Sequence, residues 1–540
     1  MVQAVDQDSL SRRSSVAPSL CPAVCADGHH PNGHRGRGPV RSRASGELTA
    51  VVPFELVDAV PAETGTVQQR LRDLPSRAGV YFLLAMCLFP EVGYRLAWDK
   101  LTAGLSGMPV VCPSAKALRD LRRRIGSTPV RALFEVLAGL LARPTTPGVR
   151  FGSYRTVSFD GCSSLRVPDS GRNRAWLGRT SHHGYPTLEL MTLVETGTRA
   201  VVGAVFGPTA EGETSYAGRL LHLLRPDMLV LWDKGFDSNA FLAQVTNTGA
   251  QVLGRLRSNR RTPVLTLLAD GSYLSVIGTV KVRIIDVQIA VACADGTSFT
   301  GSYRLVTTLT DARCYPATAL VGLYHQRWEH ESGYYALRHT IMNGRNLRSG
   351  DLAGIEQEMW SLLTLYQALR TVMVDAAESL PGTDPDRCSF SIALHTARNQ
   401  VIQANGIITP DTDRDALLGT VGIRILAGLL PRRRQRVSTR KVKHVLSGTF
   451  PRMKRWKVAR PAGAMNRVET RASDGFSDCG IPFSLPITSR ADRAMSRGQV
   501  VHGSTGALTC NRAPSWNGNR APPREVTSEV STGIGVSYDS

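Results

Sequence analysis

The sequence predicts a mixed α/β protein with more than one folded part. Its 540 residues exceed the size of an ordinary single-core domain. Period-two apolar patterns, typical of strands, begin near residue 151, and helical patterns lie before them and again after about residue 316. With 42% hydrophobic and 20% charged residues, the composition is close to the globular average, which excludes a wholly disordered chain.

Helical patterns fill the region from residue 49 to 145. The run GVYFLLAMCLF at 79–89 is apolar all round, which predicts a buried helix, and 11 residues are too few to cross a membrane. Ser114 is a start signal for a second helix, and Thr128 followed by Pro129 is one for a third. We expect a helical N-terminal domain here.

Three consecutive arginines, residues 122–124, lie on the second of these predicted helices. They are either readers of DNA or part of a plain solvated helix face, and the sequence leaves both interpretations open.

Strands are predicted from residue 151 to about 312. The turn signal Ala-Asp-Gly occurs at 269–271 and again at 294–296, each between β-rich runs, and predicts two hairpins. The four strand patterns that come first are TVSFDGCSSLRV, TLELMTLVE, AVVGAVFGP and MLVLWDKGF.

The two ends of the chain lack sustained periodicity. Residues 1–48 contain 16 Gly, Pro, Ser or Thr, and residues 461–540 contain 32. We expect a flexible arm at 1–48 and a disordered tail at 461–540. There is no apolar leader segment, so the sequence favours a cytoplasmic, nucleoid-associated protein without a membrane segment.

The formal net charge of +21 predicts a polyanionic partner, most commonly nucleic acid. From 431 to 460 there are 12 Lys or Arg and no acidic residue, whereas a solvated mixed-charge face contains acids. Arg432, Arg433 and Arg434 begin this segment and are candidates for DNA phosphate contact.

The ten cysteines are scattered, without a C-x-x-C pair, which argues against a disulfide scaffold or a zinc ribbon. Cys21 and Cys25 precede several histidines but lack a second ligand pair at a familiar spacing. Cys162 and Ser163 are weak candidates for nucleophiles, because no base is identifiable beside them.

Three acidic residues stand where catalytic carboxylates are often presented. Asp160 interrupts a strand pattern, Asp233 ends one, and Glu331 lies on a predicted helix. An acid among apolar residues must be paired or functional, because a buried unpaired carboxylate is costly. The alternative for each aspartate is a strand-end acid that caps a turn or pairs with an arginine.

The predicted helix also places four side chains on one stripe. At 100° per residue, Tyr324, Arg327, Glu331 and Arg338 fall within about 60° of one another. The stripe is either a functional surface or a solvated face with an Arg–Glu pair four residues apart.

These residues resemble a known family. The pattern Y-x2-R-x3-E-x6-K, present here with arginine at the last position, is similar to the signature of the insertion-sequence transposases of the IS-four family, in the DDE superfamily. VSFDG and LWDKGF resemble the motifs around that family's two aspartates. Lys234 and Arg338 depart from the family's usual Arg and Lys. The likeness covers roughly residues 65–375.

The resemblance implies an RNase H-like catalytic domain at 146–345, with a β-rich insertion at about 240–312, followed by a helical and basic region at 346–460. It implies that Asp160, Asp233 and Glu331 hold two Mg²⁺ ions, with Mn²⁺ as a substitute, for cleavage and strand transfer of double-stranded DNA. Further implied contacts to the transposon-end DNA involve Tyr324, Arg327, Arg338 and Lys234.

The resemblance also implies two protomers on paired ends. Two alternatives remain open: a catalytically inactive or repurposed DNA-binding protein, and a nuclease that acts on other structured DNA.

Overall fold

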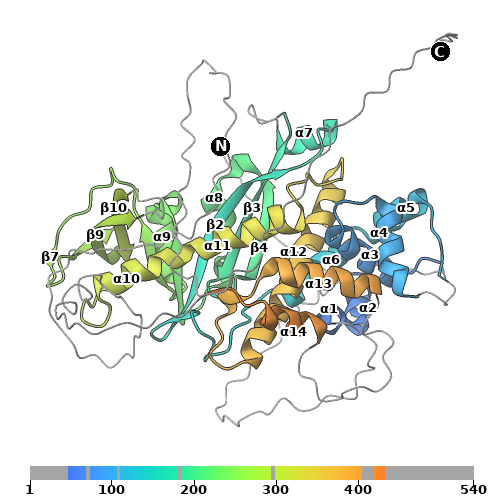
Figure 1. Cartoon of the computed structure of the whole chain (residues 1–540). Coiled ribbons are helices and arrows are strands. Elements are labelled where there is room, and N and C mark those ends of the chain that lie inside the picture. The colour runs from blue at the N-terminus through green and yellow to red at the C-terminus, as the bar shows by residue number, and fades with distance from the viewer. Residues whose placement is uncertain are drawn as a thin grey trace, which may run out of the picture. The chain divides into compact units, whose positions relative to one another are not determined.

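Figure 1 shows the computed structural model, which describes residues 47–67, 73–105, 110–178, 184–292, 298–403 and 419–431. Three predicted regions lie outside the described residues almost entirely: the arm, the basic segment with Arg432, Arg433 and Arg434, and the tail. In the described ranges, no helix combines the length and the apolar character needed to cross a membrane.

Helices precede the first strand, as predicted. The apolar run at 79–89 lies mainly in one of them, α3, whose Phe82 and Leu83 are buried. Ser114 caps α5, because its side chain accepts a hydrogen bond from the backbone N–H of Ala117 at 3.1 Å. The helices are α1 (Glu47–Val51), α2 (Phe54–Glu63), α3 (Ser76–Leu88), α4 (Tyr94–Thr102), α5 (Ala115–Ile125) and α6 (Thr128–Leu137).

The strands form one sheet with the order β4-β3-β2-β5-β6-β10-β9-β8-β7, and β1 pairs with β2 outside this order. β2 pairs parallel with β5, and β5 with β6, whereas β2, β3 and β4 pair antiparallel. The strands are β1 (Arg150–Phe151), β2 (Tyr154–Arg166), β3 (Thr187–Glu195), β4 (Ala200–Pro208), β5 (Met228–Trp232), β6 (Gln251–Arg255), β7 (Thr266–Leu267), β8 (Tyr273–Ile277), β9 (Val280–Ala292) and β10 (Ser298–Thr307).

The strands of the predicted insertion at about 240–312 belong to the same sheet as the strands before them. β10 pairs antiparallel with β6, so β7 to β10 continue the sheet that carries β2 and β5. The predicted hairpin at 269–271 is confirmed by the antiparallel pairing of β7 with β8. The turn at 294–296 lies outside the described residues, although β9 and β10 on either side of it pair antiparallel.

The central strand β5 is buried on both faces, which explains its continuous apolar sequence. Val230 and Trp232 pack on one face with α8 (Glu213–Gly218) and α9 (Asn239–Asn247). Leu229 and Leu231 pack on the other face with α10 (Ala317–Tyr324). The strand therefore has its carboxyl end fixed between two layers of helices.

The remaining helices include a long continuous helical stretch after α10. They are α7 (Gly171–Leu177), the 3-10 turn η5 (His325–Arg327), α11 (Trp328–Tyr335), the π-helical segment η6 (Ala336–Ile341), α12 (Leu352–Ser379), α13 (Phe390–Gln403) and α14 (Thr420–Ala427). α12 shares a hydrophobic core with α3 and α6, and Figure 1 shows the blue N-terminal helices beside the orange C-terminal ones. Helices from the two ends of the described chain thus form one packed layer.

Arg122 is part of this layer and is buried. For this residue, both interpretations of the arginine run are therefore wrong: it neither reads DNA nor lies on a solvated helix face. Its side chain is 8% exposed and pairs with Glu358 of α12 at 3.2 Å. It also donates to Gln357 at 2.9 Å and to Ser349 at 3.0 Å, and contacts the hydroxyl of Tyr94. These five residues, the Arg122 cluster, join α4, α5 and α12. The adjacent Arg123 is exposed.

Candidate active site

The two predicted catalytic aspartates lie level on neighbouring parallel strands. β2 pairs with β5 in the register Val157 to Val230 and Ser158 to Leu231, an offset of 73 residues. The same offset separates Asp160, within β2, from Asp233, directly after β5. Because the carboxyl ends of parallel strands meet at one edge of a sheet, the pairing brings both carboxylates to one place.

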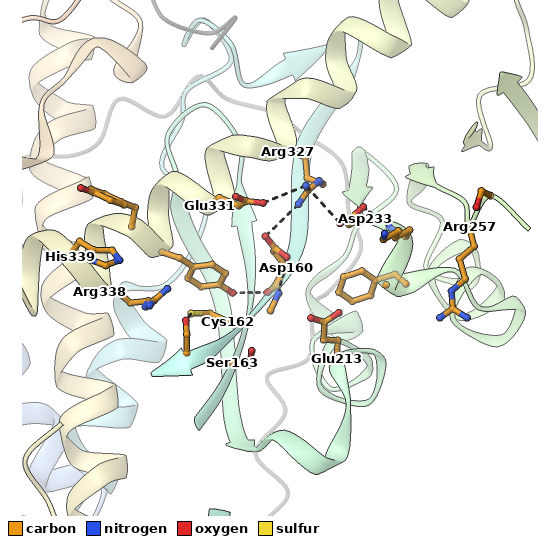
Figure 2. A pocket seen from close by; sticks show the side chains of 18 of the residues that line it. Asp160, Cys162, Ser163, Glu213, Asp233, Arg257, Arg327, Glu331, Arg338 and His339 are labelled. Carbon is orange, nitrogen blue, oxygen red and sulfur yellow. Dashed lines mark hydrogen bonds and ion pairs between the residues drawn. The ribbon is translucent and has the colours of Figure 1, made fainter. Parts of the chain in front are cut away.

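The third predicted acid, Glu331, reaches the same place from α11. The guanidinium of Arg327 lies between the three carboxylates, as Figure 2 shows. It is 3.5 Å from Asp160 Oδ2, 4.0 Å from Asp233 Oδ2 and 3.6 Å from Glu331 Oε1. We call these four residues the acid cluster. The structure therefore brings together the three acids and the arginine that the sequence selected.

The acid cluster is partly buried and carries more negative than positive charge. The carboxylate side chains are 17%, 26% and 31% exposed for Asp160, Asp233 and Glu331. Burial raises the pKa of Asp160 to about 7, since desolvation outweighs the lowering by Arg327, and Glu331 and Glu213 raise it further. Burial alone lowers the pKa of Arg327, but its tyrosine and carboxylate neighbours raise that pKa above its usual value.

A buried polar network fixes α11 against the sheet, and the sequence did not reveal it. His330 contacts the hydroxyl of Ser158 at 2.8 Å through Nδ1 and that of Thr192 at 2.6 Å through Nε2. The hydroxyl of Tyr334 contacts Thr192 at 2.9 Å and donates to the backbone oxygen of Asp160 at 2.6 Å. Burial lowers the pKa of His330 to about 3, so its ring is neutral at pH 7. The network sets the position of Glu331 relative to Asp160.

The stretch that carries the predicted stripe is not a single α-helix, because it passes from α10 through the 3-10 turn η5 to α11 and the π-helical η6. Tyr324 is 5% exposed, and its hydroxyl has no hydrogen-bond partner among the described residues. It is one of the groups that raise the pKa of Arg327. Tyr324 is thus a buried neighbour of Arg327.

The acid cluster forms the floor of a cleft of about 1240 Å³. Its walls carry basic and aromatic side chains from distant segments: Lys234, Arg257, Tyr335, Arg338 and His339. Lys234 and Arg338, both selected from the sequence, line this cleft, whereas nothing in the sequence drew attention to Arg257. Cys162 and Ser163 also line it, but burial raises the pKa of the Cys162 thiol, which disfavours the thiolate that a nucleophile needs.

Two further acids lie next to Asp160 and carry no motif. Glu213, at the start of α8, lines the cleft. Glu189 of β3 lies next to Glu213. Burial raises the pKa of Glu189 to about 7, and the charges of Glu213 and Asp160 add to that effect. The site therefore holds five carboxylates.

The donor set suits a hard divalent cation, since carboxylate oxygens are the ligands that Mg²⁺ prefers. Three carboxylates from two strands and a helix surround one positive group, the guanidinium of Arg327. In the described part of the chain, no three acidic, histidine or cysteine side chains already stand at metal-ligand spacing. Arg327 occupies the space between the acids.

Two family models match the chain. Residues 42–135 match the family described as "Insertion element 4 transposase N-terminal", and residues 153–367 match the family "Transposase DDE domain". The chain is 29% identical over 405 residues to the transposase InsG for insertion sequence element IS4 from Escherichia coli strain K12, covering 72% of this chain and 90% of InsG. The chain belongs to the IS-four family of insertion-sequence transposases.

The match to the transposase DDE domain, residues 153–367, includes all four residues of the acid cluster. Among solved structures, the chain is similar to a piggyBac transposase synaptic complex with hairpin DNA, at 12% identity and a TM-score of 0.38, covering 74% of this chain and 87% of that one.

Proposed function

We propose that this transposase binds the terminal inverted repeats of its insertion sequence, cleaves the DNA there and transfers the freed 3′-hydroxyl strands to target DNA. The observation that carries the proposal is the convergence of Asp160, Asp233 and Glu331 within 4.0 Å of one guanidinium in a cleft that is also lined by Lys and Arg side chains. The strand order, an antiparallel β4-β3-β2 unit followed by parallel β5 and β6, supports an RNase H-like core.

Asp160, Asp233 and Glu331 would hold two Mg²⁺ ions, or Mn²⁺ in their place. When bound, the two ions supply activation of the attacking water or 3′-hydroxyl and stabilisation of the leaving oxygen. The chain positions these acids through the β2–β5 register and through the contacts of His330 and Tyr334. Both devices keep the carboxylates converged without the flexibility of a loop.

Basic residues around the cleft supply phosphate contacts in this proposal. Lys234 and Arg338 line the cleft and would contact the DNA backbone near the scissile bond. Arg327, with Tyr324 beneath it, would turn from the acids to a transposon-end phosphate once cations neutralise the acids. The basic segment at 431–460, beginning with Arg432, Arg433 and Arg434, would add non-specific phosphate contacts.

Two protomers on paired ends complete the proposal. The domain limits that go with it are a helical DNA-binding domain at 49–145, a catalytic domain at 146–345 and a helical and basic region at 346–460.

Substitution of Asp233 tests the catalytic assignment. We expect Asp233→Ala to lose at least about 1000-fold in cleavage of DNA that carries the element's inverted repeats, with Mg²⁺ or Mn²⁺, because a metal-binding carboxylate is removed. Asp227→Ala is the matched control. Asp227 directly precedes the first residue of β5, whereas Asp233 directly follows the last one; it is 47% exposed and pairs with Arg225. Undiminished cleavage by Asp233→Ala would show that the acid cluster is not the catalytic centre.

The wild-type protein in the same assay separates the rival functions. Binding of the inverted repeats without metal-dependent cleavage would indicate a catalytically inactive DNA-binding protein. Cleavage that is indifferent to the inverted repeats would indicate a nuclease for other DNA structures.

A further inference from the structure

A second pair of carboxylates meets beside Asp160, on the side away from Arg327. Figure 2 shows Glu213 below Asp160, with Arg327 above it. Glu213 Oε1 and Glu189 Oε1 lie 2.9 and 2.7 Å from the point that a Cβ atom on Gly161 would occupy. The two side chains come from α8 and β3, which are separate elements, so they converge on one point without being neighbours in sequence.

Two glycines keep the space for this pair free. A Cβ atom on Gly161 would collide with both glutamates, and one on Gly235 would lie 2.7 Å from Glu213 Oε2. Neither glycine has a positive φ angle, so space and not backbone conformation excludes a side chain at these positions. Gly161 follows Asp160 directly and Gly235 lies two residues after Asp233. The glycines of both aspartate motifs therefore make room for the carboxylate of Glu213.

The Oε1 atom of Glu189 points into this space. Glu189 is 4% exposed, and its buried Oε1 atom has no hydrogen-bond partner among the described residues. A buried carboxylate oxygen without a partner is costly, and a second carboxylate beside it increases the cost. Such an arrangement is expected where a ligand supplies the missing positive charge.

We propose that Glu189 and Glu213 form a further binding position for a hard divalent cation, Mg²⁺ or Mn²⁺, beside Asp160. Oxygen donors from two carboxylates, completed by water, match the coordination that these ions take in proteins. The position is additional to the two ions assigned to the acid cluster. It extends the proposed function, but its ligands are different residues, so the two proposals fail separately.

Counting bound Mn²⁺ in the full-length protein without DNA tests this position. Electron paramagnetic resonance of free Mn²⁺ gives the number of bound ions and their dissociation constants. We expect Glu213→Gln and Glu189→Gln each to lose one bound Mn²⁺ or to weaken it at least tenfold. Glu211→Gln is the matched control, because Glu211 lies two residues from Glu213, is 38% exposed and pairs with Arg219. It should bind Mn²⁺ as the wild type does.

The Asp233→Ala variant in the same titration separates the two proposals. It should lose ions of the acid cluster and keep the ion that depends on Glu213. Equal Mn²⁺ counts and affinities in Glu213→Gln, Glu211→Gln and the wild type would overturn the new position and leave the catalytic assignment intact. Glu213 lies at the surface of the cleft, so Glu213→Gln decides the question even if substitution of the buried Glu189 prevents folding.

Discussion

The Arg122 cluster and the acid cluster contain equally buried arginines in opposite electrostatic states. Arg122 is 7% exposed and Arg327 is 5% exposed. Arg122 faces one carboxylate and completes its contacts with neutral oxygens of Gln357, Ser349 and Tyr94. Arg327 faces three carboxylates at 3.5 to 4.0 Å, and its Nε atom has no hydrogen-bond partner in the described part of the chain.

The difference separates a cluster that fixes the fold from one that we propose to bind cations. One charge balanced by one charge, with short hydrogen bonds, leaves nothing for a further ion to gain in the Arg122 cluster. Three acids around one base leave an excess of negative charge in the acid cluster, which a cation can neutralise. We therefore expect substitutions in the first cluster to change stability and those in the second to change ion binding.

The largest effect on stability should come from breaking the Arg122 cluster. Glu358→Ala removes the carboxylate that pairs with Arg122 at 3.2 Å and accepts from the backbone N–H of Arg348 at 2.7 Å. Because a buried guanidinium then lacks its counter-charge, the free energy of unfolding should fall by about 3–5 kcal/mol. Urea denaturation measures this change.

Asp120→Ala is the control for that measurement. Asp120 lies on the same helix as Arg122, but its pairs with Lys116 and Arg123 are on the surface. Its removal should leave the urea midpoint unchanged. If Glu358→Ala were as stable as Asp120→Ala, the Arg122 cluster would not fix α12 to α5.

A smaller loss of stability and a gain in metal affinity should follow from Arg327→Gln. The acids around Arg327 are partly solvated, so the metal-free protein should lose only about 1–2 kcal/mol of unfolding free energy. With its competing guanidinium gone, the acid cluster should bind Mn²⁺ about tenfold more tightly in the absence of DNA. Calorimetric titration with Mn²⁺ measures the affinity, and urea denaturation measures the stability.

Arg338→Gln serves as the matched control, since Arg338 lines the same cleft without bridging the three acids. Its Mn²⁺ affinity should stay near that of the wild type. Weaker Mn²⁺ binding by Arg327→Gln than by Arg338→Gln would mean that the guanidinium supports the metal ligands and does not compete with the cation.

The acid cluster could be predicted from the sequence because its members stand in short, ordered motifs. Each aspartate follows an apolar strand pattern, and the spacing Tyr324, Arg327, Glu331 is local. Glu189 and Glu213 could not be predicted, because only the pairing of β3 with β2 and the turn before α8 bring them to Gly161. The only available signal was the glycine that follows each aspartate, Gly161 and Gly235. Its meaning depends on Glu213, which is distant in sequence.

Arg122 shows why a charge run does not predict exposure. The run of three arginines spans 200° of a helix, so one of its members points inward, and only the packing of α12 on α5 decides which. The single α-helix expected around Glu331 was wrong for a related reason: η5 and η6 change the rotation per residue, which sequence spacing at 100° per residue does not include.

The smallest predicted effect is on the pH dependence of thermal stability. It tests the difference between the acid cluster and the Arg122 cluster through Asp160 alone. Its pKa is raised from 3.8 to about 7 in the folded protein, so the fold binds this proton more tightly than the unfolded chain does. The stability that the folded protein gains by holding this proton on Asp160 is therefore complete below pH 4 and is lost as the pH rises through 7. In metal-free buffer, Asp160→Asn, which carries no charge, should exceed the wild type in Tm by about 2–4 °C at pH 8, and the difference should shrink towards pH 5. Thermal unfolding followed by circular dichroism between pH 5 and 8 measures it. Parallel curves for the two proteins would show that the negative charge of the acid cluster is already balanced before any cation binds, as it is in the Arg122 cluster.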